Sequence, residues 1–378
     1  MVSGCEELTY HVDFEIPQEA ANVRCSEMIA ESELVSLIER FRECRLLVVG
    51  DVMLDEYLWG QVGRICPEAP VPIVEEVRRS SVPGGMANVA ANAVALGAQV
   101  ALGGVVGADA QGKSLRDMLG VLGIDTTGLR TDPQRPTTTK TRIIAHNQQV
   151  VRVDREDTRP ISSALEQNLL EWFRERLPSA DVCILSDYAK GVLSPALTPE
   201  LIAVAHQYGR PVVVDPKGWD YRRYRGASII TPNLREARLA LTNGAPPPDD
   251  LFAIGSGLLE LLPGTSVLVT RGADGLALFR EHHPPLCIPS AARQVYDVTG
   301  AGDTLIATLA VAIAAGVSLD LASVLANRAG GLAVGKLGTT TVGASELLAT
   351  ASIVNMEHST ADFGSMQAGP AFSFHGMP

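Results

Sequence analysis

Lysine is scarce in this sequence, and basic charge as a whole is outweighed by acidic charge. Only five of the 31 lysine and arginine residues are lysine, and the formal net charge is −12. Such a balance argues against nucleic-acid binding through bulk charge, so an anionic substrate must be met by a few local cations. Any lysine near a candidate site therefore stands out; the five are Lys113, Lys140, Lys190, Lys217 and Lys336.

Clustered cysteines and long apolar runs are also missing. The six cysteines lie far apart, without a Cys-x-x-Cys pair or a Cys/His group at metal spacing, which fits reduced thiols and argues against a zinc site. Near the N-terminus, Glu6 and Glu7 stand where a signal peptide would carry basic residues. The longest uncharged stretch, Thr304 to Leu319, is too short for a membrane span and predicts a buried helix. We expect a cytoplasmic protein without membrane contact.

Apolar residues are plentiful, and their spacing predicts the fold class. They make up 46% of the chain, enough for a full core. Leu34, Leu37, Ile38 and Phe41 recur at helical spacing just before the apolar run 46–49. Further short β-branched runs alternate with helical segments, which predicts an α/β fold with a mostly parallel sheet covered by helices on both faces. The candidate strands are 100–106, 182–185, 212–214, 228–230 and 267–269.

Two regions interrupt this alternation. Residues 70–79 and 137–154 alternate polar and apolar side chains with no helix between, which predicts strands outside the main sheet. We expect an N-terminal extension over 1–30, one domain over 31–350 and a C-terminal tail over 351–378.

The most informative stretch is the glycine-rich turn 297–303, which leads into an apolar helix. Its glycines would let a phosphate approach the amides of Gly300, Ala301 and Gly302, where the helix N-terminus favours negative charge. Asp303 would then accept the proton of an attacking hydroxyl during phosphoryl transfer. Alternatively, Asp303 only complements the helix dipole, an effect of ~0.3 to 1 kcal/mol.

Several motifs in order resemble those of the ribokinase-like (PfkB) carbohydrate kinases. Residues 297–304 are similar to the C-terminal signature of that family, 84–88 to its Gly-Gly substrate segment, 231–236 to its Asn-x-x-Glu motif and 270–272 to its nucleotide loop. The resemblance spans residues 45 to about 350. It implies a three-layer αβα sandwich with a small β-lid over 70–79 and 137–154, ATP and Mg²⁺ as cofactors, and a homodimer formed through the lid. A monovalent cation near the anion hole, present in some relatives, is left open.

The resemblance assigns one group of residues to ATP and its metal ion. Asn233 and Glu236, three positions apart, would orient water around Mg²⁺, although the same spacing is that of a helix capping box. Lys217 would reach an ATP phosphate, or else belong to a surface turn. The remaining assigned contacts are Leu234, Arg235, Thr270, Gly272, Gly275 and Asn327.

A second group would hold the sugar. Asp55, and with it Asp51, would accept hydrogen bonds from hydroxyls, and the segment Gly84 to Asn88 would hold the sugar hydroxyls as well. Its adjacent glycines, Gly84 and Gly85, would let the sugar lie against backbone. The runs 50–57, 64–73 and 186–191 resemble the branch that phosphorylates the anomeric hydroxyl of D-glycero-β-D-manno-heptose 7-phosphate for lipopolysaccharide precursors. A phosphorylated sugar needs cations at its far end; the candidates are Arg64, Lys140, Arg142 and Lys190, with Asp187 as a further contact. The nucleotidyltransferase motif that some relatives carry is not found.

A competing motif points to another class of enzyme. Residues 107–114 satisfy the P-loop pattern Gly-x-x-x-x-Gly-Lys-Ser, which would make Lys113 a phosphate ligand. Asp109 would place a negative charge inside that loop, and the stretch also resembles a structural segment of the kinases named above. We therefore favour coincidence. A sugar-binding protein without catalysis on the same fold is a third alternative.

Overall fold

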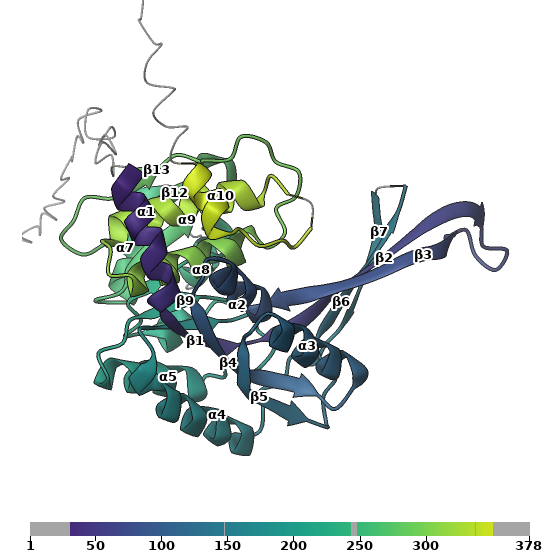
Figure 1. Ribbon diagram of the computed structural model, residues 1–378, viewed down its shortest axis with the longest axis horizontal. Coiled ribbons are helices and arrows are strands. Elements are labelled where there is room, and N and C mark those ends of the chain that lie inside the picture. The colour runs from purple at the N-terminus through teal and green to yellow at the C-terminus, as the bar shows by residue number, and fades with distance from the viewer. Residues whose placement is uncertain (1–30, 147, 243–247, 337, 351–378) are drawn as a thin grey trace, which may run out of the picture.

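The computed structural model describes residues 31–146, 148–242, 248–336 and 338–350, which form a sandwich with a projecting arm (Figure 1). Within these residues the central sheet has nine strands in the order β13-β12-β11-β10-β9-β8-β1-β4-β5. All neighbours pair in parallel except β11–β12 and β12–β13. The strands are β1 Arg45–Gly50, β4 Gln99–Gly107, β5 Asp125–Asp132, β8 Val182–Ser186, β9 Val212–Asp215, β10 Ile229–Ile230, β11 Ser266–Thr270, β12 Leu276–Phe279 and β13 Leu286–Ile288.

Helices cover both faces of this sheet and split the core in two. The helices are α1 Glu31–Arg40, α2 Met86–Ala95, α3 Ala110–Val121, α4 Ser163–Arg176, α5 Leu197–Gln207, α6 Leu234–Ala240, α7 Leu251–Leu261, α8 Ala301–Ala314, α9 Leu319–Ala333 and α10 Ala344–Ala349. Buried residues of α1, α2, α3, α8, α9 and α10 pack on one face, and those of α4 to α7 on the other. Because side chains alternate along a strand, Leu46 and Val48 face the first cluster while Leu47 and Val49 face the second. The predicted αβα architecture is confirmed.

A second sheet forms the arm that leaves the sandwich in Figure 1. Its strands, in the order β3-β2-β6-β7, are β2 Val52–Ile65, β3 Pro72–Gly85, β6 Thr139–Ala145 and β7 Gln148–Arg155. We call this four-stranded sheet the lid. The two regions predicted as extra strands lie in it, as β3 and the β6–β7 pair. Strand β2 was missed because its first residues are buried and apolar, like a continuation of β1, and only its outer half alternates.

The five candidate strands are all present, each within two residues of its expected bounds. The residues at helical spacing, Leu34 to Phe41, lie in α1 and the short 3-10 turn that follows it. The apolar stretch starting at Thr304 lies in α8, which is buried from Asp303 to Ala312. No helix among the described residues is long and apolar enough to span a bilayer. The expected extension 1–30 and tail 351–378 lie outside the described residues.

Candidate active site

Asp303 lies in the first turn of α8, at the carboxyl edge of the sheet, and is 6% exposed. Its Oδ2 accepts a hydrogen bond of 2.7 Å from Asn88 Nδ2 on α2, and its Oδ1 accepts one from the Tyr188 hydroxyl. Burial raises its pKa to about 6, although the two hydrogen bonds favour the charged form. A carboxyl with that pKa is ionised near neutral pH and still basic enough to accept a proton, as a general base requires.

The turn before α8 has the backbone that the sequence predicted. Gly300 takes a left-handed conformation (φ 78°), which only glycine adopts without strain, and it serves as the N-cap of α8. A Cβ placed on Gly302 would meet nothing within 4 Å, so the turn borders open space. The Ala301 amide lies 3.3 Å from the Val298 carbonyl, so it is not as free as the sequence suggested. An anion could approach from the Gly302 side.

Asp51 has a different role from the predicted sugar contact. It is 1% exposed, and its carboxylate accepts hydrogen bonds from the backbone amides of Tyr188 (2.9 Å), Lys190 (3.0 Å) and Val192 (3.0 Å). Since both oxygens are occupied inside the protein, Asp51 shapes the loop after β8 instead of facing a substrate. The sequence could not show this, because Asp51 and Asp55 differ only in which neighbours the fold gives them.

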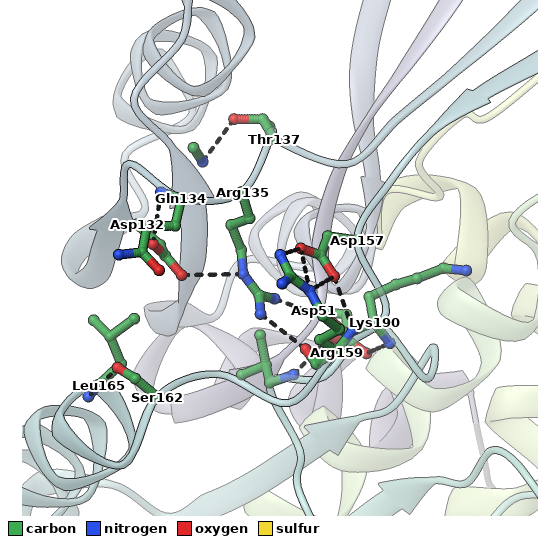
Figure 2. A network of polar contacts seen from close by, with 12 residues as sticks. Asp51, Asp132, Gln134, Arg135, Thr137, Asp157, Arg159, Ser162, Leu165 and Lys190 are labelled. Atoms are coloured by element: carbon green, nitrogen blue, oxygen red, sulfur yellow. Dashed lines mark hydrogen bonds and ion pairs between the residues drawn. The ribbon is translucent and has the colours of Figure 1, made fainter.

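The same loop is fixed from its other side by Arg135 (Figure 2). The Arg135 guanidinium donates to the carbonyls of Lys190 (3.2 Å) and Arg159 (2.8 Å) and pairs with Asp132 at 3.2 Å. Its side chain is only 9% exposed, so these contacts are largely shielded from water. The amides held by Asp51 and the Lys190 carbonyl held by Arg135 leave residues 188–192 little freedom.

Asp187 is also a structural residue, contrary to its predicted contact with substrate. Its Oδ2 accepts hydrogen bonds from Arg223 (2.6 Å) and the Tyr224 hydroxyl (2.8 Å), and its Oδ1 accepts from the Ala189 amide at 2.7 Å. Burial raises its pKa to about 6, and the Arg223 charge opposes that rise. These contacts secure the start of the loop that carries Tyr188.

Asp55, at the base of the lid on β2, is the acidic residue that faces the candidate sugar site. It is 5% exposed and pairs with Arg142 of β6 at 2.7 Å. Gly84, on β3, lies directly against it: a Cβ there would come within 2.6 Å of Asp55 Oδ2. Gly85, with φ 54°, ends β3 and precedes α2, which carries Asn88. The structure therefore brings together Asp55, the two glycines and Asn88, as the sequence predicted.

Of the four cations predicted for a distant phosphate, three lie at the lid base and one does not. Lys140 and Arg142 share a face of β6, since Lys140 Nζ lies 5.7 Å from the Tyr188 ring centroid and Arg142 contacts Asp55. Lys190 pairs with Glu156 at 2.8 Å. The prediction that Arg64 binds the substrate phosphate is wrong for a site within one chain. Arg64 lies nine positions beyond Asp55 along β2, about 30 Å away in an extended strand. Its side chain is exposed beside Glu75.

Lys140 is the cation left available at the lid base. Burial lowers its pKa, and no carboxylate pairs with it among residues 31–146, 148–242, 248–336 and 338–350. A desolvated ammonium group that no carboxylate neutralises is ready to bind an anion.

The nucleotide end of the site lies at the start of α6. Asn233 Oδ1 accepts from the Glu236 amide (2.9 Å) and Glu236 Oε2 accepts from the Asn233 amide (3.1 Å), so the capping box that the spacing left open is present. Glu236 Oε1 also pairs with Lys217. Thr270 bridges to Asn233. The predicted ATP residues Lys217, Asn233, Glu236 and Thr270 are thus neighbours, while Leu234 is partly buried and Arg235 is exposed on α6.

Three further residues predicted to contact the nucleotide differ in their surroundings. Gly275 (φ 83°) lies against β13, where a Cβ would come within 2.1 Å of the Ile288 carbonyl oxygen, so only glycine fits. Gly272 (φ 59°) has open space around it. Asn327 of α9 donates to the Pro289 carbonyl at 2.7 Å, which ties the end of β13 to α9.

Asp215, at the end of β9, joins the two ends of the site. Burial raises its pKa well above the ordinary value, and the charges of Asp303 and Glu236 raise it further. Among the described residues, no group of three His, Cys, Asp or Glu side chains is arranged to hold a metal ion directly. The oxygen donors of Asp215 and Glu236 do suit Mg²⁺ carried in on phosphates, because a divalent cation would relieve their mutual repulsion.

The competing P-loop motif does not present free backbone amides to a phosphate. Asp109 caps α3: its Oδ1 accepts from the Gly112 amide (2.9 Å) and from Thr137 Oγ1 (2.6 Å). The Gly107 amide in turn donates to Thr137 Oγ1 at 2.9 Å. The amides that would cradle a phosphate are therefore used within the protein, which argues against Lys113 as a phosphate ligand.

Sequence reasoning missed Tyr188, Asp215 and Arg135 as parts of the site. Tyr188 and Asp215 directly follow or end buried strands, at the edge where ligands bind in open α/β sheets, and that position could have marked them. No local signal marked Arg135, since its partners Lys190 and Arg159 are 55 and 24 residues away.

Comparisons with known proteins agree with this geometry. The sequence family described as "pfkB family carbohydrate kinase" matches residues 44–346. The bifunctional protein HldE of Geotalea uraniireducens is 46% identical over 317 residues, covering 84% of this chain and 65% of that protein. HldE of Caulobacter vibrioides is 47% identical over 327 residues, covering 85% and 66%. The chain thus spans about two thirds of the length of these curated relatives.

Solved structures show the same fold at low identity. A ribokinase of Arabidopsis thaliana, solved with ribose and ATP, superposes with a TM-score of 0.65 at 22% identity, covering 82% of this chain and 98% of that one. Phosphofructokinase-2 of Escherichia coli, solved with potassium, gives a TM-score of 0.67 at 17% identity, covering 82% and 99%.

Proposed function

Since this chain belongs to the pfkB family of carbohydrate kinases, we propose that it transfers the γ-phosphoryl group of ATP to the anomeric hydroxyl of D-glycero-β-D-manno-heptose 7-phosphate. The product would be the 1,7-bisphosphate, a precursor for lipopolysaccharide. The observation that carries the proposal is the placement of the buried base Asp303 at one end of a site whose other end holds Asp55 and the lid cations. A phosphorylated sugar matches both ends, and the similarity to the HldE proteins at 46% and 47% identity supports the heptose branch.

The reaction would use these groups in one displacement. The sugar hydroxyl, placed by Asp55 and Gly84, attacks the γ-phosphorus as Asp303 accepts its proton, and ADP leaves. Lys217 and the amide side of Gly302 would face the transferring negative charge. Magnesium, when bound with ATP, would neutralise phosphate charge next to Glu236, Asn233 and Asp215.

The sugar's own phosphate would meet the cations of the lid base. Lys140, Arg142 and Lys190 all lie there, and Lys140, which pairs with no carboxylate of the described residues, has donor hydrogens for a phosphate oxygen. Burial lowers the pKa of Lys140, and the charge of a bound phosphate would favour its ammonium form again. When the lid closes on substrate it would exclude water that otherwise hydrolyses ATP. We place this reaction in the cytoplasm, where ATP is available.

The lid also suggests how two copies would associate. Its strands expose Ile65, Val77, Val151 and Val153, each at least 46% exposed, on an arm that stands away from the sandwich. Exposed apolar side chains on sheet strands favour pairing with a second lid. We propose a homodimer through the lid, which sedimentation velocity of the wild type and a Val77→Lys/Val153→Lys variant would test.

An ADP-release screen tests the substrate. Heptose 7-phosphate, fructose 6-phosphate, ribose and adenosine would be compared at equal concentration, with ³¹P NMR to locate the new phosphate on the anomeric carbon. The proposal predicts the highest kcat/KM for the heptose phosphate and no turnover in Asp303→Asn. Preference for ribose or adenosine would replace the substrate while leaving the kinase assignment in place. Loss of activity in a folded Lys113→Ala variant would instead support the P-loop alternative.

A further inference from the structure

Among the described residues, Tyr188 is one of two side chains that donate a hydrogen bond to the carboxylate of Asp303. It follows β8 by two residues, and its hydroxyl donates to Asp303 Oδ1, while Asn88 donates to Oδ2 at 2.7 Å. A carboxylate oxygen can accept two hydrogen bonds. Each oxygen of Asp303 therefore keeps one free lone pair. The direction of that lone pair is set by the donor that occupies the other lone pair of the same oxygen.

The backbone of Tyr188 is held in place by buried groups. Asp51 accepts from the Tyr188 amide at 2.9 Å, and Arg135 secures the same loop through the Lys190 carbonyl (Figure 2). Asp187, which precedes Tyr188, is fixed by Arg223 and Tyr224. A hydroxyl on so constrained a segment can impose an orientation on its partner, because it cannot easily move to follow it.

Tyr188 also contacts the lid. Lys140 Nζ, on β6, lies 5.7 Å from the centroid of its ring, within range of a cation–π contact. One side chain therefore touches both the lid base and the base Asp303.

We propose that Tyr188 is a positioning residue for Asp303: its hydroxyl keeps the carboxylate ionised and turns a free lone pair toward the acceptor hydroxyl. This inference rests on the proposed role of Asp303 as the general base. It adds a residue that the family motifs of the sequence did not assign.

The electrostatic surroundings give the direction of the effect. Asp303 is faced by the hydroxyl of Tyr188, the amide of Asn88, the carboxylates of Asp55 and Asp215, and the ammonium of Lys140. Burial and the Asp55 charge raise the pKa of Asp303, whereas Tyr188, Asn88 and Lys140 lower it. Burial and nearby carboxylates raise the pKa of Tyr188 well above its usual value, so it remains a donor at neutral pH. Removing the hydroxyl should therefore raise the pKa of Asp303.

Tyr188→Phe tests this without depending on turnover. Wild type and variant labelled with [γ-¹³C]aspartate are titrated by NMR, and the Asp303 resonance is identified by its loss in Asp303→Asn. We expect a midpoint near pH 6 in the wild type and about one pH unit higher in Tyr188→Phe, the usual size of such a hydrogen-bond effect. An unchanged midpoint in the folded variant overturns the proposal.

Tyr224→Phe is the matched control. It removes a tyrosine hydroxyl from a buried carboxylate in the adjoining network, that of Asp187, without touching Asp303. We expect the Asp303 midpoint to stay at its wild-type value. An equal rise in Tyr224→Phe would mean that the shift reflects general loosening of the loop, and the positioning role would be rejected.

Kinetic measurements distinguish a Tyr188 hydroxyl that positions Asp303 from one that only occupies the place of the substrate hydroxyl. The acid limb of kcat/KM against pH should move up in Tyr188→Phe by the same amount as the NMR midpoint, with KM for ATP unchanged. If the Tyr188 hydroxyl merely occupies the place of the substrate hydroxyl, Tyr188→Phe should lower the sugar KM and leave the acid limb of kcat/KM unchanged. That result would contradict the positioning role. Absence of turnover in the wild type would refute the proposed function while the NMR result still decides the inference.

A second measurement covers the case in which Tyr188→Phe does not fold. 3-Fluorotyrosine at position 188 keeps the hydroxyl and provides a ¹⁹F resonance. That resonance should shift with the ionisation of Asp303, with a midpoint near pH 6. A ¹⁹F shift that is flat through that range would show that the two groups are not coupled, against the proposal.

Discussion

The carboxyl edge of the central sheet and the lid arm treat charge in opposite ways. At the sheet edge, Asp303 is 6% exposed and both of its oxygens accept hydrogen bonds from fixed donors. Along the arm, Arg64 and Glu75 form an ion pair with side chains 68% and 66% exposed. A buried charge strongly affects its neighbours because water does not screen it, whereas an exposed pair contributes ~0 to 1 kcal/mol.

In the proposed reaction, this difference would separate proton transfer from substrate selection. Proton transfer needs a carboxylate whose pKa and orientation are fixed, and the buried, hydrogen-bonded Asp303 would supply both. The lid carries cations that matter only where they come close to the sheet, at Lys140 and Arg142. Substitutions should therefore grow milder with distance from Asp303.

The strongest test of the contrast is Asp303→Asn. The amide has the same shape but cannot accept the hydroxyl proton, so we expect kcat to fall by about 10³-fold, within the range of general-base effects. ADP release with saturating substrates measures it, and circular dichroism checks the fold. A loss below tenfold would remove Asp303 from the reaction.

The same variant should reveal what the buried charge costs in stability. The pKa of Asp303 is raised to about 6 from 3.8, so the folded state binds its proton more tightly than the unfolded state does. Its contribution to stability is therefore present below about pH 4 and is lost as the pH rises through 6. Relative to wild type, Asp303→Asn should gain about 2 kcal/mol between pH 4.5 and pH 8. Urea unfolding at both pH values measures the change; a constant difference would mean that the pKa is not raised.

At the junction of the sheet edge and the lid, Gly84→Ala should weaken the binding of the sugar more than the binding of ATP. Its Cβ would come within 2.6 Å of Asp55 Oδ2, which forces the carboxylate from its place. We expect the sugar KM to rise about tenfold, equivalent to one lost charged hydrogen bond, with the ATP KM unchanged. Gly120→Ala, in α3 and outside the site, is the matched control for the sugar KM, since a Cβ there meets nothing within 4 Å.

At the nucleotide end, Lys217→Ala should raise the ATP KM by about three- to tenfold, because Lys217 is 45% exposed and its charge is partly screened. The sugar KM should stay the same. An equal rise in both would indicate that the loss of the Lys217–Glu236 pair disturbs α6 as a whole.

The smallest effect should come from Arg64→Ala, with kcat/KM within about twofold of wild type, as for other exposed charges. Arg142→Ala, on the same lid but paired with Asp55, is the comparison and should reduce kcat/KM for the sugar at least tenfold. A large Arg64 effect would break the contrast, because it would mean that the lid tip reaches a site, for instance that of a second copy.

The sequence by itself determined the features that depend on neighbours along the chain. Apolar runs set the strands of the central sheet, and the glycine turn set the N-terminus of α8 with Asp303 in its first turn. The capping box of α6 was visible as the spacing of Asn233 and Glu236. Each of these follows from local backbone preferences and the periodicity of burial.

Only the tertiary structure decided which of the acidic residues is free to act. Asp51 and Asp55 lie four positions apart, and the local sequence does not distinguish them. In the structure, three amides of the loop after β8 donate to the carboxylate of Asp51, while Asp55 faces the lid cations. Tyr188 meets Asp303 across 115 residues and Asn88 meets it across 215. Contacts at such separations arise when parallel strands bring their carboxyl ends to one edge, and no local pattern records which side chains then face each other.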